Sequence, residues 1–189
     1  LMQVSPPAVT EMVKKLLAEQ LLLKDRSVGY ILTELGLKLV SDLYRKHRLI
    51  EVFLVNHLGY TTEEIHEEAE VLEHTVSDHF VEQLEKLLHF PKNCPHGGTI
   101  PAKGELLVEK NNTTLANVKR TGHYLLTRVH DDFDLLTYLE KNELQVGKTI
   151  HFLSYDNYSQ LYTLEVDGQE IQIGRSIAKQ IYVEKIQKP

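Results

Sequence analysis

Histidine and glutamate recur at spacings that could hold a divalent cation between two predicted helices. Glu70, Glu73 and His74 stand at positions i, i+3 and i+4, so their side chains share one helix face. His47 and Glu51 stand at i and i+4 on the preceding helix. If these helices pack antiparallel, two imidazoles and three carboxylates meet at one point. One such pair usually marks an ordinary solvated surface, but two pairs on adjacent helices favour a metal site.

The ligand types narrow the choice of cation. Carboxylate oxygens and imidazoles favour Mn²⁺ or Fe²⁺ over copper, and Zn²⁺ competes because affinity follows the Irving–Williams order. The stretch His66-Glu67-x-x-Glu70 partly matches a zinc-hydrolase helix, but Glu70 stands where that motif needs a second histidine. A metal-dependent hydrolase is therefore the weaker alternative, since no loop that could position a nucleophile is evident.

A second set of ligand types lies in the loop Cys94-Pro95-His96-Gly97-Gly98. A thiol and an imidazole two residues apart are not a specific signal, and an exposed loop cysteine is the simpler interpretation. Because this loop directly follows the second predicted helix, it could fold back and supply ligands to a second site.

The N-terminal segment carries groups that suit a nucleic acid. Hydroxyl and basic side chains line the first predicted helix and the hairpin after it: Ser5, Thr10, Lys14, Lys15, Lys24 and Arg26. Such groups bind phosphates. Pro7 and Ala8 are small and apolar enough to contact thymine methyls, whereas Glu11 should face a base-edge donor or point away. An ordinary solvated helix is the alternative interpretation.

Turn and period signals indicate the helical elements that position these residues. Ser5-Pro6-Pro7 begins a helix, and short strands at 21–24 and 30–32 follow, which is the order of a winged helix-turn-helix. A long helix starts after Thr33 and ends at Gly59. Thr61-x-x-Glu64 is a capping box that predicts a second long helix reaching Leu88. The wide apolar faces of these helices predict a dimerisation bundle over 34–90.

The last third of the chain changes to the period of strands. Pro91 to Gly104 must be a loop, because it holds three prolines and three glycines. The elements expected after it are strands at 124–129, 149–155, 159–166, 170–173 and 181–184, with short helices at 133–140 and 176–179. Short strands with turns about every ten residues predict a small closed β-barrel of the Src-homology-3-like type.

Composition and charge limit the class of protein. The 189 residues include one cysteine, which excludes an internal disulfide framework and fits a reducing cytoplasm. No apolar run approaches the roughly 18–20 residues that span a bilayer, and no leader precedes the first helix, so no membrane partner is expected. Residues 1–60 carry eight basic and six acidic side chains, net +2, while residues 61–90 carry one and nine, net −8. This partition predicts that residues 1–60 bind an anionic partner and that residues 61–90 bind cations.

Three stretches together resemble one known family. Met2–Val13, Tyr44–Glu51 and Glu68–His74 resemble the diphtheria-toxin-repressor family of metal-dependent transcription regulators, and the Cys-Pro-His-Gly-Gly loop is most similar to its streptococcal manganese-responsive branch. The resemblance covers essentially the whole chain. It implies a mainly α protein with a small β-barrel: a winged helix-turn-helix at 1–33, a metal-binding and dimerisation domain at 34–110, and a Src-homology-3-like, ferrous-iron-transport-A-like domain at 111–189.

The resemblance also implies the ligand sets. It assigns Glu70, Glu73 and His74 to a primary, activating site, and Glu51, Cys94, His96 and Asp131 to a secondary site. It makes His47 and His66 candidate ligands. In the family an acidic ligand from the N-terminal segment completes the primary site, and the chain is expected to begin inside the DNA-binding motif, after that ligand.

The function expected from the resemblance is a homodimeric repressor of metal-uptake genes that binds operator DNA when Mn²⁺, or Fe²⁺ or Zn²⁺ in its place, is bound. The DNA-binding residues expected are Ser5, Pro7, Ala8, Thr10, Glu11, Lys14 and Arg26. No catalytic residue and no small organic substrate are expected. A metal-buffering or adaptor protein is a further alternative, but it would not need the winged helix-turn-helix at the N-terminus. DNA binding that depends on Mn²⁺ would distinguish a repressor from both the hydrolase and the metal-buffering or adaptor protein.

Overall fold

The chain forms two compact units in this computed structural model. The structure describes residues 5–62 and 64–186, so positions 2–4 of the N-terminal motif lie outside the described residues. The first unit holds the chain up to Lys46 together with Pro101–Val108. The second unit holds His47–Ile100 and the chain from Glu109 onward.

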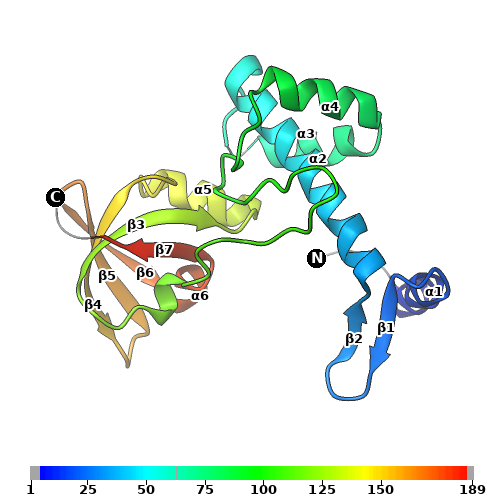
Figure 1. The fold of residues 1–189 in the computed structure, drawn as a ribbon. Coiled ribbons are helices and arrows are strands. Elements are labelled where there is room, and N and C mark those ends of the chain that lie inside the picture. The colour runs from blue at the N-terminus through cyan, green and yellow to red at the C-terminus, as the bar shows by residue number, and fades with distance from the viewer. Residues whose placement is uncertain (1–4, 63, 187–189) are drawn as a thin grey trace. The chain divides into compact units, whose positions relative to one another are not determined.

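The first unit contains a helix, a hairpin and the start of a long helix, in the order predicted for a winged helix. Helix α1 (Pro6–Ala18) begins with prolines in its first turn, where no backbone N–H is needed. Strands β1 (Leu22–Asp25) and β2 (Gly29–Leu32) pair antiparallel, as Figure 1 shows. Asp25 Oδ1 accepts from the Ser27 and Val28 N–H groups and fixes the turn. Helix α2 (Glu34–Leu58) follows.

Three helices and the loop after them share a core in the second unit. The second half of α2 packs with α3 (Ile65–Glu73) and α4 (Asp78–Leu87). The buried apolar side chains of this core are Leu49, Ile50, Val52, Leu54, Ile65, Ala69, Val81, Leu84, Cys94 and Ile100. No helix within residues 5–62 and 64–186 is both long and apolar enough to cross a membrane.

The prediction of one helix from Thr61 to Leu88 is wrong, because the chain breaks it at residues 74–77. Ser77 has an extended backbone, and its side chain accepts from the Phe80 N–H at 3.2 Å, so it caps a new helix. The first of the two helices also starts later than expected. Glu64 accepts from the Thr61 N–H, as a capping box requires, but α3 begins only at Ile65.

The C-terminal part of the second unit is a five-stranded antiparallel sheet in the order β6-β5-β4-β3-β7 (Figure 1). Its strands are β3 (Gly122–Val129), β4 (Thr149–Asp156), β5 (Leu161–Val166), β6 (Gln169–Gly174) and β7 (Ile181–Lys185). A 3₁₀ turn, η1 (Leu115–Asn117), precedes them, and helices α5 (Phe133–Lys141) and α6 (Arg175–Ala178) accompany them.

This sheet is open rather than closed. Among the described residues β6 and β7 form its two edges and do not pair with each other, so the expected closed barrel is not observed. The fold is therefore mixed α/β, and the sheet has its own core, which includes Leu126, Ile150, Leu164, Ile173 and Ile181.

Candidate metal centre

Helix α2 buries two candidate metal ligands, His47 and Glu51, beside its apolar core residues. His47 and Glu51 lie one turn apart between the core residues Leu49, Ile50 and Leu54. Glu51 is 0 % exposed and His47 is 9 % exposed. Burying a carboxylate this completely is costly unless a cation or several hydrogen bonds compensate for it.

The Glu51 carboxylate lacks that compensation from protein hydrogen bonds. Its Oε1 lies 3.3 Å from His47 Nε2 and 3.2 Å from His96 Nδ1. Both Glu51 oxygens, His47 Nε2 and His96 Nδ1 are buried and have no hydrogen-bond partner. Four converging polar atoms in this condition are the arrangement expected around a cation.

The second nitrogen of each imidazole is held by a partner that points the first nitrogen inward. His47 Nδ1 lies 2.8 Å from Glu73 Oε2, and His96 Nε2 lies 2.9 Å from the Thr62 carbonyl oxygen. Because both partners accept hydrogen bonds, each of these nitrogens carries the proton. Once a cation displaces the second proton of each ring, the lone pairs of His47 Nε2 and His96 Nδ1 would be directed toward Glu51, as in metal-binding histidines.

Two sets of potential ligands meet at Glu51. In the first set, His47, Glu51, His66 and Asp131 each offer one ligand atom, and these atoms lie within 4.8 Å of one another. His66 Nδ1 lies 2.8 Å from Asp131 Oδ2. In the second set, Glu51, Cys94 and His96 do the same, and all three side chains are buried.

The loop that carries Cys94 and His96 is fixed by its own backbone and by β3. The Cys94 N–H donates to Gly98 O, and the Gly97 N–H donates to Cys94 O, each at 2.9 Å. Gly97 has φ +81°, and a Cβ there would clash with the Thr127 carbonyl, so only glycine lets the loop approach β3. The Val129 N–H then donates to His96 O at 3.0 Å.

Arg48 and Glu109 tie the same loop to α2. Arg48 donates to the Thr99 carbonyl, and its Nη2 donates to Glu109 Oε1 at 2.6 Å. Glu109 Oε2 accepts from the Thr99 N–H at 3.0 Å and lies 4.0 Å from Arg128 Nε on β3. At Gly98, a Cβ would lie 2.6 Å from the Arg48 guanidinium carbon. Glu109 thus contacts α2, the loop and β3, the three segments that carry or precede His47, Glu51, Cys94, His96 and Asp131.

Without a cation, protons balance the negative charge of the cluster. Burial alone lowers the pKa of His47, but the carboxylates of Asp131 and Glu51 outweigh burial and raise it to about 10. For His96, burial also lowers the pKa, but Cys94 and Glu51 raise it to about 11. Burial raises the pKa of Asp131 and Glu51, but the neighbouring imidazoles lower both below their ordinary values. Burial raises the pKa of Cys94.

The donors fit a divalent cation. Both sets combine carboxylate oxygen with imidazole nitrogen, and the second set adds one sulfur. A cation there would take the place of the protons on His47 and His96 and would satisfy the four buried atoms that lack hydrogen bonds.

The residues predicted for the primary site have different surroundings. Glu73 is buried against His47, whereas Glu70 and His74 are exposed. His74 lies at the end of α3, with Nε2 3.5 Å from Glu73 Oε1. Neither ligand set in the described residues includes Glu70, Glu73 or His74. Their assignment remains a prediction.

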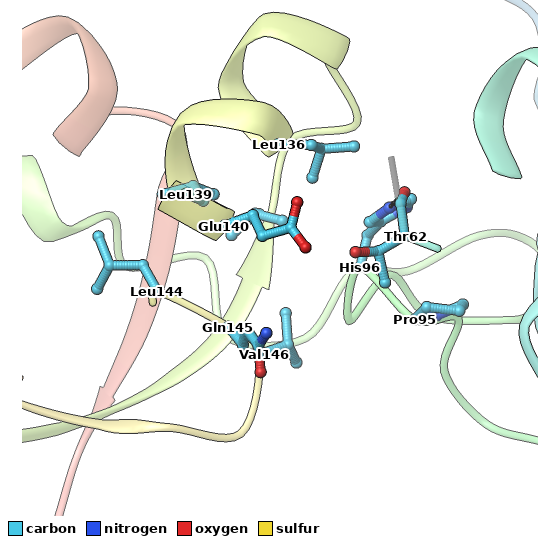
Figure 2. A pocket seen from close by; sticks show the side chains of 10 residues that line it. Thr62, Pro95, His96, Leu136, Leu139, Glu140, Leu144, Gln145 and Val146 are labelled. Atoms are coloured by element: carbon cyan, nitrogen blue, oxygen red, sulfur yellow. Dashed lines mark hydrogen bonds between the residues drawn. The ribbon is translucent and has the colours of Figure 1, made fainter. Parts of the chain in front are cut away.

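A pocket of about 230 Å³ borders His96 on the side of the sheet domain. Figure 2 shows Leu136, Leu139 and Glu140 of α5 on one side of it, with Thr62, Pro95 and His96 on the other. Among the candidate metal ligands, only His96 lines it.

The residues predicted to contact DNA are all exposed on α1 and the hairpin. Ser5 is at the N-cap of α1 and makes no side-chain capping bond. Thr10 Oγ1 donates to Pro6 O, and Lys14 Nζ lies 2.7 Å from Glu11 Oε1. Pro7 and Ala8 lie in the first turn, and Arg26 lies in the turn between β1 and β2.

The sequence predicted that His47 and Glu73 would face each other from adjacent helices, and the two side chains are in contact. It did not indicate that His66 contacts Asp131, and it gave Arg48 and Glu109 no role. These residues lie far apart in sequence, and no local spacing rule connects them.

Comparison with known proteins identifies the family. Residues 33–102 match the iron dependent repressor, metal binding and dimerisation domain, and residues 113–185 match the FeoA domain. The structure resembles the crystal structure of ScaR with bound Cd²⁺, with 78 % sequence identity, a TM-score of 0.94, and coverage of 98 % of this chain and 87 % of that chain. The chain belongs to the iron-dependent repressor family.

Other members of this family extend the comparison. The structure of the manganese regulator SloR is 59 % identical, with a TM-score of 0.91 and coverage of 98 % of this chain and 86 % of that chain. The diphtheria toxin repressor of Corynebacterium diphtheriae is 26 % identical over 195 residues, which is 96 % of this chain and 84 % of that protein. The resemblance stated from the sequence is confirmed. Because the members of this family are transcriptional repressors, the chain is not an enzyme, and the hydrolase alternative is not supported.

Proposed function

We propose that this repressor responds to Mn²⁺ and, as a metal-bound homodimer on operator DNA, represses genes for metal-ion uptake. The observation that carries the proposal is the buried Glu51 carboxylate, which faces two imidazole nitrogens that, like its own oxygens, have no hydrogen-bond partner. A metal-responsive repressor needs a site of this kind, because cation binding must change its affinity for DNA.

Two groups of residues hold the metal in this proposal. Glu51, Cys94, His96 and Asp131 form the secondary site, with His47 and His66 as further candidate ligands beside Glu51 and Asp131. Glu70, Glu73 and His74 form the primary site; the exposure of Glu70 and His74 leaves both side chains accessible to a cation. A bound divalent cation supplies positive charge, and the side chains supply its position and the exclusion of water.

Manganese is the cation proposed, because the first ligand set offers carboxylate oxygen and no sulfur. Two of its four residues offer carboxylate oxygen and two offer imidazole nitrogen. Cys94 makes the second set softer, so Zn²⁺ should compete there. One solved structure of the relative ScaR is described as that of a manganese-activated repressor, and two other structures of ScaR are described with bound Zn²⁺ or Cd²⁺.

Exposed apolar side chains on α3, α4 and the turn after α4 support a homodimer. Val71, Phe80, Leu87 and Phe90 are 64 %, 45 %, 53 % and 54 % exposed. Helix faces with this many exposed apolar side chains usually pack against a partner, and the matched domain is a dimerisation domain.

DNA recognition is assigned to α1, with the β1–β2 hairpin as a wing. Ser5 and Thr10 contact phosphates in this proposal, Pro7 and Ala8 contact thymine methyls, and Arg26 contacts the flanking backbone. Since Pro6 and Pro7 have no N–H groups, the Ser5 hydroxyl carries more of the phosphate contact than the helix terminus does.

The proposed domains are the DNA-binding domain at 1–33, the metal-binding and dimerisation domain at 34–110, and the Src-homology-3-like domain at 111–189.

The proposal is tested with full-length protein and a pool of random duplexes. Sequences retained at saturating Mn²⁺ are selected, and the affinity for the selected duplex is measured with Mn²⁺, Fe²⁺, Zn²⁺ or chelator. We expect selective, Mn²⁺-dependent binding. Retention of the same duplex in chelator, or retention of no duplex with any of the metals, would overturn the proposal.

A further inference from the structure

Three neighbouring strands of the C-terminal sheet place metal-ligand side chains in one row. The register sets His123 of β3 opposite His151 of β4, and His151 opposite Glu165 of β5. Five of the residues beside them in sequence are buried in the sheet core: Tyr124, Ile150, Phe152, Leu164 and Val166. By alternation, the row therefore lies on the face of the sheet opposite the core.

The side chains in this row already lie against one another. The imidazole rings of His123 and His151 stack with centroids 4.3 Å apart and planes inclined by 19°. His151 Nδ1 lies 3.8 Å from Glu165 Oε2. The side chains of His151 and Glu165 are 33 % and 44 % exposed, so a cation could reach them from solvent while being partly screened from it.

The next strand adds a second carboxylate. Glu170 of β6 stands directly opposite Glu165. Like charges directly opposite each other destabilise a sheet. A cation bound at Glu165 would offset this repulsion.

We propose that His123, His151 and Glu165 form a surface site for a borderline divalent cation, for which Zn²⁺ is the best candidate. Two imidazoles and one carboxylate are a ligand set of three-residue zinc sites, which keep water in the fourth position. Two nitrogens on one tetrahedral zinc are about 3.3 Å apart. The rings, which stack with nearly parallel planes, must therefore tilt out of the stack about χ2 so that one nitrogen of each points at the same position, a motion of partly exposed side chains that takes picoseconds to nanoseconds.

This site is separate from the candidate centre at Glu51. His123 is at the start of β3, and Asp131 is eight residues later, past the end of the strand. Eight residues of extended chain span roughly 26 Å. One cation cannot serve both sites.

A cation at this row would link three adjacent strands and stabilise the sheet. Ligands that bind only the folded state stabilise it by RT ln(1 + L/Kd), where L is the free ligand concentration, so the melting temperature rises with that concentration. Zinc should therefore increase the thermal stability of the C-terminal sheet, and this effect does not require DNA binding.

The test counts zinc bound to full-length protein by equilibrium dialysis at one fixed free zinc concentration. The variants His123→Gln and His151→Gln should each bind about one zinc fewer per chain than the parent. His79→Gln is the matched control, because His79 is an exposed histidine on α4. It should bind as much zinc as the parent. A zinc count unchanged in both row variants, or an equal loss in His79→Gln, would overturn the proposal.

Two further measurements exclude a trivial loss of fold. The melting temperature in chelator should be the same for the parent and both row variants, whereas zinc should raise it more in the parent. If either histidine variant has a lower melting temperature than the parent in chelator, its fold is weakened, and Glu165→Gln replaces it in the zinc-binding measurement. That variant should weaken zinc binding at the row at least about tenfold. Parent-like zinc affinity in Glu165→Gln would overturn the proposal.

Discussion

Glu51 is the residue shared by both ligand sets of the candidate centre. It is fully buried, and both of its oxygens lack hydrogen bonds. Glu51→Gln keeps the shape of the side chain but removes its charge. Because losing an orienting partner alone costs about 10–100-fold in metal affinity, losing this ligand should cost more than about 100-fold. Calorimetry with Mn²⁺ and with Zn²⁺ measures the loss.

Glu67→Gln is the matched control, because Glu67 is an exposed glutamate on α3. It should bind both metals as the parent does. Undiminished affinity in Glu51→Gln for both metals would exclude Glu51 as a ligand.

Protons on His47 and His96 should compete with the metal. The pKa values of about 10 and 11 mean that both imidazoles are protonated at pH 7 in the metal-free protein. Metal binding at both ligand sets should then release about three protons, one from each imidazole and one from the Cys94 thiol, whose pKa burial raises, and affinity should rise with pH between about pH 6 and pH 9. Calorimetry in buffers of different ionisation enthalpy counts these protons. Affinity independent of pH would contradict this charge state.

The same pKa values predict the opposite trend for the stability of the metal-free protein. A pKa raised on folding contributes stability that is fully present below the unfolded pKa of about 6.5 and is lost as the pH rises through the folded value. For His47 and His96, this loss extends from about pH 6.5 to about pH 10–11. Raising the pH should therefore weaken the metal-free fold while strengthening metal binding.

The candidate ligands differed in how far the sequence could predict their contacts. His47 and Glu51 are one helical turn apart, and Cys94 and His96 share a short loop, so local spacing singled them out. Asp131 is 65 positions from His66, its hydrogen-bond partner, and only the family resemblance indicated it. No spacing rule shows that a buried carboxylate lacks hydrogen bonds, because that depends on every segment packed around it.

At the scale of elements, local signals located most helices and strands but not how they end or close. The apolar stripe continues through residues 74–77, so periodicity predicted one helix, whereas the Ser77 cap begins a second helix there. Alternation located the strands of the sheet. Closure of a sheet depends on pairing between its edges, β6 and β7, which alternation does not encode.

Glu109 contacts α2, the loop at 94–99 and β3, which carry or precede the candidate ligands. We therefore predict that Glu109 positions those ligands. Glu109→Gln weakens its ion pair with Arg48 and should loosen the loop that holds Cys94 and His96. We expect about a tenfold loss of Zn²⁺ affinity at the second ligand set and faster alkylation of Cys94 in the metal-free protein.

Glu105→Gln, an exposed glutamate nearby in sequence, is the control and should change neither property. A role in stability alone predicts a lower melting temperature with unchanged metal affinity. That result would show that Glu109 holds the fold together but does not position the ligands.

The β1–β2 hairpin should add affinity without sequence preference. Arg26 is exposed in its turn, and the Asp25 side chain fixes that turn. Arg26→Ala removes at most one phosphate contact, so it should reduce the slope of log affinity against log salt concentration by about one. The preferred operator should stay the same. An altered base preference with an unchanged slope would assign Arg26 to base readout instead.

At the scale of the whole molecule, the proposed function couples a metal centre in one part of the chain to DNA recognition in another. Such coupling is one free energy shared by the metal ion and the DNA, so each must change the protein's affinity for the other by the same factor. Coupling energies of this kind usually correspond to changes in affinity of about 5–150-fold. The matched family domain and the exposed apolar faces of α3 and α4 favour a dimer as the coupled unit.

The most direct test measures the Mn²⁺ affinity of full-length protein by calorimetry, with and without a saturating amount of the selected operator duplex. A scrambled duplex of equal length and charge is the control. We expect operator to tighten Mn²⁺ binding by about 5–150-fold, equal to the factor by which Mn²⁺ tightens operator binding, and we expect no such effect of the scrambled duplex. The same Mn²⁺ affinity with and without operator would contradict this coupling.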